Sequence, residues 1–440
     1  MNSILLTNAQ ILTMEGASED IFSGFIAIKG DTIAMVGSDN SLLESFVAEN
    51  PSCRVIDCQG RVVMPGLINT HCHVAMTLQR NLVEDMELMK WLTGYVWPFE
   101  ALQSDDDIEA GALLGVAEML LGGVTTFVDM YFSMDRIAEA CERLGCRALL
   151  TSTLLDARAQ EFKSDFERLH KRASSSKLVR AGVAPHAPYT CSPQTLTIIK
   201  EVTDEYGTLP STIHLLETQG EDQMIRDSHG VGAAEYLDNA SLLGEQTILA
   251  HCVHLDEPTR ELIRARACSV AHCPQSNMKL ASGIAPLTAL HRAGVNCTIA
   301  TDGVCSNNDL DMWDEMRSAA LLARVATMDA TAISAYDILR MATVNGAKAI
   351  GMEGRLGILA EGALADIIVV DNQKLHHRPR LNTVSSLVYC AKASDVVTTI
   401  VNGEVVVHDG QLCGGDIEAI ARDVEQRSGR IIDQLAVFSV

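Results

Sequence analysis

Alternating apolar and polar residues at both ends of the chain predict short β-strands. Lys29-Gly30-Asp31 and Asn402-Gly403 separate paired runs, and glycine supplies the positive φ that a tight hairpin turn needs. Neither end has enough strands for a stable sheet of its own. We therefore expect one small β-sandwich domain built from residues 1–63 and 355–440. The predicted strands lie at residues 4–14, 24–37, 54–57, 365–370 and 399–407.

Between these ends, residues 64–354 repeat a different unit, which is a short apolar run followed by a loop and an amphipathic helix. Helical spacing of apolar residues is clear in 108–121 and 193–206, each of which is followed by glycine. Strands that alternate with helices over about 270 residues predict a (β/α)8 barrel of the TIM type. An open doubly wound sheet has a similar strand count and is the alternative. The eight candidate strands are residues 67–71, 124–130, 147–155, 179–185, 210–216, 247–253, 269–273 and 297–301.

Composition agrees with a well-cored globular α/β protein of 440 residues, 47% of them hydrophobic and 21% charged. The net charge is −23 and no basic block occurs, so we expect no nucleic-acid partner. The N-terminus has no basic lead-in, and no 18 apolar residues run together, so we expect neither a signal peptide nor a membrane contact. The 13 cysteines are scattered and never spaced Cys-x-x-Cys, which is typical of reduced thiols in a cytoplasmic protein.

Candidate chemistry begins at the end of the first predicted barrel strand, where His71 and His73 are separated by one residue. Side chains alternate along a strand, so both histidines point to the same face. Imidazole is a common ligand for zinc, and two on one face would fill half of a tetrahedral shell. A pair of surface histidines is the alternative for this motif alone.

Polar residues at other strand ends favour a metal site. His186, His214, His251 and Asp302 follow the fourth, fifth, sixth and eighth predicted strands. The carboxyl ends of barrel strands share one rim, so these side chains are predicted to converge with the first pair. Any single histidine could instead have a structural role and be held by hydrogen bonds. Such a role does not explain why the whole set lies at strand ends. We predict a metal site with His, His, His and Asp ligands.

Glu217 follows His214 by three residues and is the candidate general acid/base, because hydrolysis at a metal needs a carboxyl group that moves protons. Its alternative role is an acid at a helix N-terminus. His251 is expected to orient the attacking water or to polarise the reacting centre, while His254 is expected to be loop structure. Dinucleotide-binding, Walker, Ser-x-x-Lys and Cys-x-x-Cys deaminase signatures are incomplete or absent.

These motifs resemble the amidohydrolase superfamily and, within its ATZ/TRZ-like branch, the methylthioadenosine / S-adenosylhomocysteine deaminases. The likeness runs nearly from end to end and includes the split β domain. The matching stretches are Pro65-Gly66-Leu67-Ile68-Asn69-Thr70-His71-Cys72-His73, Gly122-Gly123-Val124-Thr125-Thr126, His186-Ala187-Pro188-Tyr189, His214-Leu215-Leu216-Glu217-Thr218, Ala250-His251-Cys252-Val253-His254, Thr301-Asp302-Gly303, Ser306-Asn307-Asn308 and Gly362-Ala363-Leu364-Ala365-Asp366.

The resemblance implies one divalent metal ion, with zinc expected and iron or manganese as alternatives. Its ligands would be His71, His73, His214 and Asp302, and no lysine on the fourth strand could carry a carbamate that bridges two metals. The implied reaction is hydrolytic deamination of an adenine nucleoside by a metal-bound hydroxide that attacks C6. Asp302 would accept the proton of the water, Glu217 would protonate N1 and His251 would stabilise developing charge.

The resemblance also implies substrate contacts at positions 91, 100, 186 and 306. Glu100 would accept hydrogen bonds from both ribose hydroxyls, and His186 would contact the nucleoside. Trp91 would cover the purine or simply pack. Ser306, in the motif after Asp302, completes this set, together with Glu217 and Asp302 themselves.

One departure from the family bears on the substrate. Relatives that handle S-adenosylhomocysteine hold its carboxylate with an arginine near the end of the third strand, where this chain has Ser152, and Arg158 is nearby but expected to be misplaced. Serine does not replace a bidentate arginine. We therefore expect 5′-methylthioadenosine, 5′-deoxyadenosine or adenosine to be preferred over S-adenosylhomocysteine.

Two alternatives to this function remain open at the level of sequence. One is an aminohydrolase or chlorohydrolase of a triazine, guanine or another nitrogen heterocycle, against which the ribose-facing Glu100 argues. The other is an inactive metal-binding scaffold, against which Glu217 argues, because a scaffold needs no proton shuttle. The family resemblance also implies a homo-oligomer, either a dimer or a tetramer.

Overall fold

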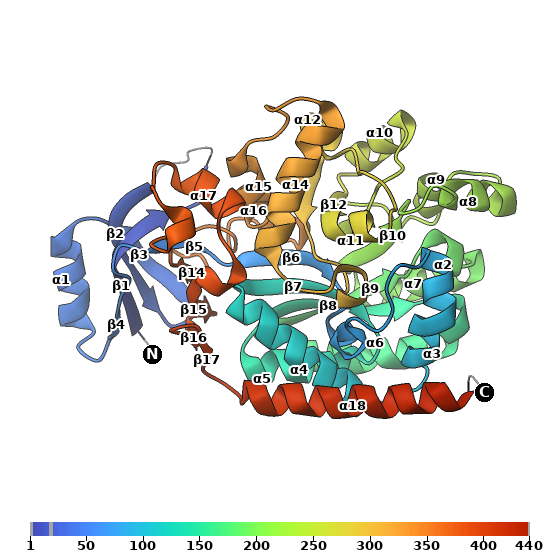
Figure 1. Ribbon diagram of the computed structural model, residues 1–440, viewed down its shortest axis with the longest axis horizontal. Coiled ribbons are helices and arrows are strands. Elements are labelled where there is room, and N and C mark those ends of the chain that lie inside the picture. The colour runs from blue at the N-terminus through green and yellow to red at the C-terminus, as the bar shows by residue number, and fades with distance from the viewer. Residues whose placement is uncertain (1–2, 17–20, 439–440) are drawn as a thin grey trace.

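The computed structural model describes residues 3–16 and 21–438. It consists of a barrel of strands surrounded by helices and a smaller sheet at one end (Figure 1). The barrel sheet has eight strands in the order β13-β12-β11-β10-β9-β8-β7-β6, and their register is parallel throughout. Thr70 Oγ1 and Thr298 Oγ1, on the first and last strands, are 2.6 Å apart and bring the two edges together. The predicted barrel is confirmed, and the open sheet is not observed.

All eight predicted barrel strands are present, with ends that differ by at most two residues from the predicted ones. Helices lie between them, including α4 (Asp105–Leu121), α5 (Met134–Leu144), α7 (Pro193–Tyr206) and α10 (Glu257–Ala265). The strands are β6 (Leu67–Cys72), β7 (Val124–Tyr131), β8 (Arg147–Leu154), β9 (Val179–Pro185), β10 (Ser211–Leu215), β11 (Thr247–His251), β12 (Ser269–His272) and β13 (Asn296–Ile299).

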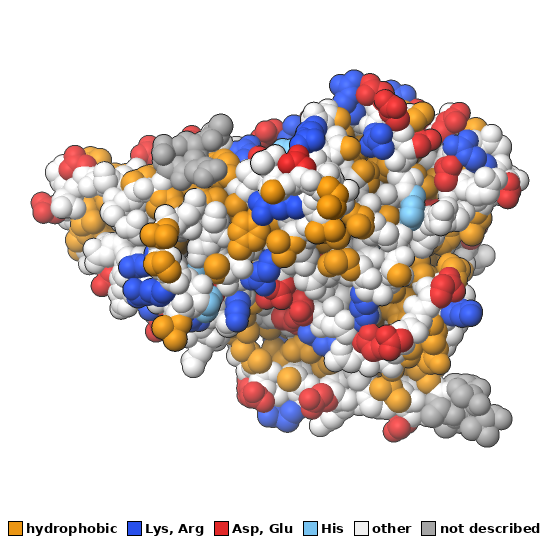
Figure 2. Space-filling view, turned by 45° about the horizontal axis from the view of Figure 1, so that its top comes forward, with side chains coloured by type: hydrophobic (Ala, Val, Ile, Leu, Met, Phe, Trp, Pro, Cys, Tyr) orange, Lys and Arg blue, Asp and Glu red, His pale blue; other side chains and the backbone are white. Residues whose placement is uncertain are grey.

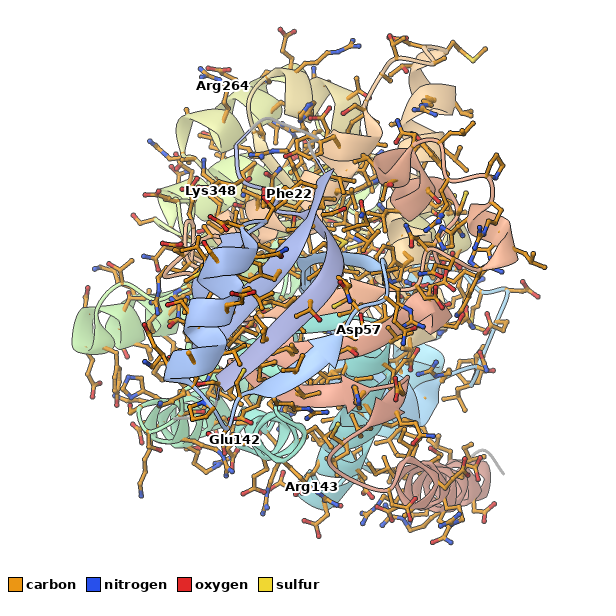
Figure 3. The ribbon with its side chains drawn as sticks, turned by 90° about the vertical axis from the view of Figure 1, so that its left-hand side faces the viewer. Phe22, Asp57, Glu142, Arg143, Arg264 and Lys348 are labelled. Atoms are coloured by element: carbon orange, nitrogen blue, oxygen red, sulfur yellow. The ribbon has the colours of Figure 1, made fainter. Side chains whose placement is uncertain are left out.

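The second sheet is built from both ends of the chain, as predicted, but its strands form one continuous sheet and not two facing sheets of a sandwich. β5 (Val62–Pro65) is the reason, because it pairs with β1 (Ser3–Leu12) on one side and with β14 (Ile367–Val370) on the other. Figure 3 looks onto this sheet, with α1 (Asn40–Glu49) in front of it. Its remaining strands are β2 (Ile21–Lys29), β3 (Thr32–Gly37), β4 (Arg54–Asp57), β15 (Val396–Val401), β16 (Glu404–His408) and β17 (Gln411–Leu412).

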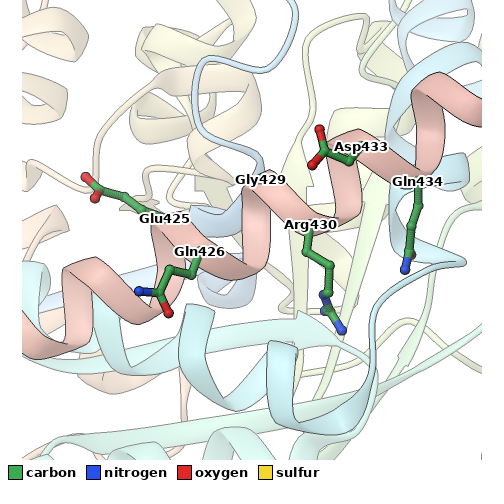
Figure 4. A pocket seen from close by; sticks show the side chains of 6 residues that line it. All are labelled: Glu425, Gln426, Gly429, Arg430, Asp433 and Gln434. Atoms are coloured by element: carbon green, nitrogen blue, oxygen red, sulfur yellow. The ribbon is translucent and has the colours of Figure 1, made fainter.

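The C-terminal helix α18 (Ile417–Phe438) lies against α4 of the barrel (Figure 1), although the predicted boundaries place it in the small domain. Val424 and Ile431 pack with Phe99 of α3 (Trp97–Glu100) in one apolar cluster. Asp107, which is fully buried, binds Arg427 and Arg430 of α18 at 3.0 and 2.5 Å. Arg430 is one of the α18 side chains that line a shallow surface depression, and Figure 4 shows these side chains. Burial of these residues explains why the helix leaves the small sheet.

The surface carries both signs of charge, and Lys and Arg are interspersed with Asp and Glu on the face shown in Figure 2. Within residues 3–16 and 21–438, no helix combines the length and the apolar character that crossing a bilayer requires. All of the cysteines carry free thiols, and most of them are buried.

Candidate metal centre and active-site cavity

A cavity of about 780 Å³ opens at the carboxyl ends of the barrel strands. Its lining includes His73, His214, Glu217, His251 and Asp302, whereas His71 is fully buried and does not line it. One wall of the cavity is the segment from α2 (Leu88–Trp91) to α3. Ligand sites of (β/α)8 barrels lie at this rim because the loops after the strands converge there. The position of the cavity therefore agrees with the site expected from the sequence.

Four histidines and one aspartate meet at the floor of the cavity. His73 Nε2 is 3.3 Å from His214 Nε2 and 3.2 Å from Asp302 Oδ1. His71 Nε2 is 3.5 Å from the same Asp302 oxygen. Potential ligand atoms of His71, His214, His251 and Asp302 all lie within 4.8 Å of one another. The fold thus brings together side chains that are up to 231 positions apart, and His251 lies beside the four predicted ligands.

The hydrogen bonds around these histidines fit a metal ion. His73 Nδ1 is 2.6 Å from the carbonyl oxygen of Met130, and His214 Nδ1 is 3.0 Å from that of His186, so each Nε2 is left with a lone pair facing inward. His71 is fully buried, and neither of its ring nitrogens has a hydrogen-bond partner among the described residues. Tetrahedral zinc with bonds of about 2.0–2.1 Å needs ligand atoms about 3.3 Å apart, which matches the separations here.

Burial and mutual contacts set the charges of this cluster. Burial lowers the pKa of His71 to about 4 and holds that of His214 well below its usual value. Burial also acts to lower the pKa of His73, but its contact with Asp302 dominates and raises this pKa to about 9. Burial alone would raise the pKa of Asp302, yet His71 and His73 keep it well below the usual value for an aspartate. Asp302 is therefore a carboxylate, His71 and His214 are neutral and can act as ligands, and His73 has to release its proton when it binds a metal.

The second oxygen of Asp302 is held by two hydroxyl groups. Ser276 and Ser306 each donate a hydrogen bond of 2.7 Å to Asp302 Oδ2. Asp302 has a left-handed φ of 62°, so these bonds also support an uncommon backbone conformation. Ser306 was predicted as a substrate contact, and it lines the cavity as well as holding Asp302. Ser276 was not predicted, because its Ser-x-x-Lys spacing with Lys279 belongs to an incomplete signature that was set aside.

Glu217 lies beside the cluster and lines the cavity. Its Oε2 is 3.7 Å from His251 Nε2, and its Oε1 accepts a bond of 3.4 Å from Ser282. Burial raises the pKa of Glu217, which suits a group that must both give and take a proton. Glu221 accepts hydrogen bonds of 2.9 Å from the backbone N–H groups of Leu216 and Glu217 and so fixes the turn that carries Glu217.

His251 and His254 are separated as the sequence predicts. His251 is buried at the end of β11, and its Nδ1 is 3.0 Å from Asn277 Oδ1. Burial lowers the pKa of His251, but the nearby charges of Glu217 and Asp302 outweigh burial and raise it. His254 Nε2 is 2.7 Å from the backbone oxygen of Ser282, which is a loop contact.

The predicted substrate contacts Glu100, His186 and Trp91 all line the cavity. Burial raises the pKa of Glu100 to about 7, against the opposing effect of the Tyr131 hydroxyl. Burial lowers the pKa of His186 to about 3, so its imidazole is neutral. Trp91 is 8% exposed. These positions agree with contacts to a bound ligand, whereas the individual roles stay predictions.

Two expectations about the third barrel strand are wrong. Ser152 is buried on the side of β8 that faces the helices, together with Leu150 and Leu154, and does not line the cavity. Its neighbour Thr153 lines the cavity instead, because side chains alternate along the strand. Arg158 is not misplaced, since it also lines the cavity, with its guanidinium 4.0 Å from the centre of the Phe132 ring.

A second histidine-rich group lies in the region after β14. His376 Nε2 and His377 Nε2 are 2.7 and 3.1 Å from the same oxygen of Asp395, and Lys374 Nζ is 3.0 Å from the other oxygen. These are hydrogen-bond distances, and the ammonium group already neutralises the carboxylate. The group is therefore an ion-pair network that fastens a loop, and it does not resemble the cluster in the barrel.

Comparisons with known proteins agree with this geometry. Residues 62–406 match the model of the amidohydrolase family. The chain is 42% identical to a 5-methylthioadenosine/S-adenosylhomocysteine deaminase of Pelotomaculum thermopropionicum, over 99% of this chain and 100% of that protein. It is 39% identical to a 5′-deoxyadenosine deaminase of Methanosarcina barkeri, over 99% and 100%.

A solved structure shares both the fold and part of the sequence. It is a zinc-bound adenosine deaminase from Xanthomonas campestris, which is 32% identical and superposes with a TM-score of 0.89 over 98% of this chain and 99% of that chain. The family match covers most of the chain, and the relatives align along nearly all of it. The chain therefore belongs to the amidohydrolase family.

Proposed function

We propose that this protein is a metal-dependent aminohydrolase that deaminates adenine nucleosides to the inosine analogue and ammonia. The observation that carries the proposal is the His, His, His and Asp cluster, with Glu217 beside it, at the floor of a cavity that also contains Glu100. Relatives named as deaminases of adenine nucleosides support the substrate class.

The proposed cofactor is one zinc ion per chain, held by His71, His73, His214 and Asp302. Three inward-facing imidazoles and a carboxylate are suitable zinc ligands, and the adenosine deaminase of Xanthomonas campestris contains zinc. When bound, the metal lowers the pKa of a water molecule to about 7 and so supplies a nucleophile at neutral pH. The serines on Asp302 Oδ2 leave Oδ1 to face the histidines.

In the proposed reaction, a C6–O bond forms, the C6–N6 bond breaks and ammonia leaves. Asp302, which its low pKa keeps charged until the reaction begins, accepts a proton from the attacking water and returns it to N6 as ammonia leaves. Glu217, whose raised pKa suits it to both steps, gives a proton to N1 of the purine and regains one from the new hydroxyl at C6. His251, oriented by Asn277, stabilises the charge that develops at C6.

We assign the sugar to the wall of the cavity. Glu100 accepts hydrogen bonds from the ribose hydroxyls, His186 contacts the nucleoside from the loop after β9, and Trp91 covers the purine. Nucleosides without a carboxylate, namely 5′-methylthioadenosine, 5′-deoxyadenosine and adenosine, are expected to be preferred over S-adenosylhomocysteine. The support is the charge of the lining, in which Arg158 is paired with Glu161 at 2.9 Å and is accompanied by Asp156 and Asp105.

The test is ammonia release by the purified, metal-loaded protein with adenosine, 5′-methylthioadenosine, S-adenosylhomocysteine, guanine and a chlorinated triazine. Deamination of the adenine nucleosides is expected. Glu217→Gln should lose most of the activity while it keeps its metal, measured by elemental analysis. Glu100→Ala should raise KM for nucleosides far more than for free bases. Turnover of guanine or the triazine alone would replace the proposal with the other aminohydrolase or chlorohydrolase, and no turnover would favour a scaffold.

We also propose a cytoplasmic location and a homo-oligomer, either a dimer or a tetramer. Free thiols on all of the cysteines support the first, since such thiols persist in a reducing compartment. The second comes from the family resemblance. Light scattering coupled to size-exclusion chromatography measures the mass in solution, and a species of 47.5 kDa would contradict it.

A further inference from the structure

Two polar atoms of residues that line the cavity have no partner within the described residues. Thr153 Oγ1 and Gln103 Nε2 are buried, and neither makes a hydrogen bond within the described residues. Both residues line the cavity, and Thr153 is 7% exposed. Buried polar groups in folded proteins are nearly always hydrogen-bonded, and those that are not call for an explanation. A bound ligand that supplies the missing partners is such an explanation.

Both residues are connected to the wall that carries Glu100, Gln103 along the chain and Thr153 through the neighbouring strand, where Tyr131 of β7 pairs with Ser152 of β8. Gln103 follows Glu100 by three residues and its backbone N–H donates to the Glu100 carbonyl at 3.2 Å. The Gln103 Oε1 accepts a bond of 3.0 Å from the Tyr131 hydroxyl, whereas its Nε2 has no partner and can donate to a ligand. Thr153 is next to the last residue of β8, where inward-pointing side chains reach the rim.

Charge in this region disfavours an anionic group. Arg158 is the only lysine or arginine among the described residues that line the cavity. Its Nε is bound to Glu161 at 2.9 Å, and Asp156 and Asp105 also line the cavity. A carboxylate on the substrate would share Arg158 with Glu161 in a cavity that contains two further acids. A neutral group that both donates and accepts hydrogen bonds meets no such obstacle.

We infer that Thr153 and Gln103 are specificity-determining residues that bind the 5′-hydroxyl of the nucleoside. This inference rests on the proposed function and narrows its substrate to adenosine-type nucleosides with a free 5′-hydroxyl. A hydroxyl can accept a bond from Gln103 Nε2 and exchange one with Thr153 Oγ1, whereas a thioether sulfur is a weak acceptor and a 5′-methyl group is none. Adenosine is therefore preferred over 5′-methylthioadenosine and 5′-deoxyadenosine, and S-adenosylhomocysteine is the poorest substrate.

The experiment compares adenosine with 5′-deoxyadenosine, which differ only in the 5′ oxygen, in wild-type holoenzyme and in Thr153→Val. Valine keeps the shape of the side chain and removes its hydroxyl. We expect kcat/KM for adenosine to fall about ten- to a hundredfold and kcat/KM for 5′-deoxyadenosine to change less than about twofold. Thr153→Ser should restore the preference. Gln103→Met should also lower the ratio of kcat/KM for adenosine to kcat/KM for 5′-deoxyadenosine.

Thr126→Val is the matched control, because Thr126 Oγ1 is also buried without a partner on a barrel strand but does not line the cavity. This control should leave the adenosine to 5′-deoxyadenosine ratio unchanged. The inference is overturned if the wild type prefers 5′-deoxyadenosine, or if Thr153→Val lowers kcat/KM equally for both nucleosides. Either result leaves the proposed function standing, because the nucleosides are still deaminated. If no adenine nucleoside is deaminated and calorimetry detects no binding of adenosine, both the inference and the proposed function are overturned.

Discussion

Glu221 offers the sharpest test of how the fold positions the general acid/base. Its carboxylate is 2% exposed and accepts hydrogen bonds of 2.9 Å from the N–H groups of Leu216 and Glu217. Leu216 has a left-handed φ of 51°, which this pair of bonds supports. We predict that Glu221→Ala both destabilises the protein and misplaces Glu217, although Glu221 is not assigned a role in the chemistry.

The size of the effect follows from the two bonds. An unpaired buried N–H group costs about 1–3 kcal/mol, so losing both acceptors costs about 2–6 kcal/mol. For a chain of 440 residues, an unfolding entropy of about 2.1 cal/mol/K per residue amounts to about 0.9 kcal/mol/K. Glu221→Ala is therefore expected to lower Tm by about 2–6 °C. A shift of Glu217 by about 1 Å would lower kcat about a hundredfold.

Scanning calorimetry gives Tm, and ammonia release gives kcat for the same samples. Glu257→Ala is the matched control, because Glu257 is likewise the first residue of a helix but is exposed, and the loss of such an acid costs only about 0.3–1 kcal/mol. If Glu221→Ala melts within 1 °C of this control and keeps its kcat, the role assigned to Glu221 is wrong.

Three further predictions concern sugar binding, the junction of the two sheets and the metal. Burial raises the pKa of Glu100 to about 7, so protonation of Glu100 should lower kcat/KM for adenosine as the pH falls below about 7. Glu100→Gln should flatten this acidic limb of the pH profile, and an unchanged limb would contradict the role of Glu100. Arg147 binds Asp366 of the small sheet through two buried contacts of 2.9 and 3.0 Å, so Arg147→Met should cost about 3–5 kcal/mol, or about 3–5 °C in Tm, and an unchanged Tm in calorimetry would refute this. If zinc is normally present at about 1,000 times its Kd, its removal by a chelator should lower Tm by about 4–5 °C. Added zinc should restore both Tm and activity. Full activity in the chelated protein would disprove the metal requirement.

The sequence by itself determined the elements and the identity of most groups at the site. Apolar residues repeat about every 2 residues in a strand and every 3.6 residues in a helix. This difference located all eight barrel strands, because each strand is short and bounded by turn residues. The spacing of His71 and His73 placed them on one face, since they lie on the same strand end. Local rules suffice for such features because the groups concerned are close along the chain.

Only the tertiary structure decided which side of a fully buried strand faces the cavity. All eight residues of β8 are buried, so no apolar and polar alternation shows whether Ser152 or Thr153 points inward. A parallel strand that is covered on both faces has no alternation of apolar and polar residues. An error of one residue then assigns every side chain of the strand to the wrong face.

Contacts between distant segments were likewise beyond the sequence. Ser276, which follows β12, meets Asp302, which follows β13, because these two strands are neighbours in the barrel. Helix α18 follows the small sheet in the chain but packs on α4, where its arginines reach the buried Asp107. Such partners depend on closure of the barrel and on burial of whole surfaces, which are properties of the assembled chain and not of any short stretch of it.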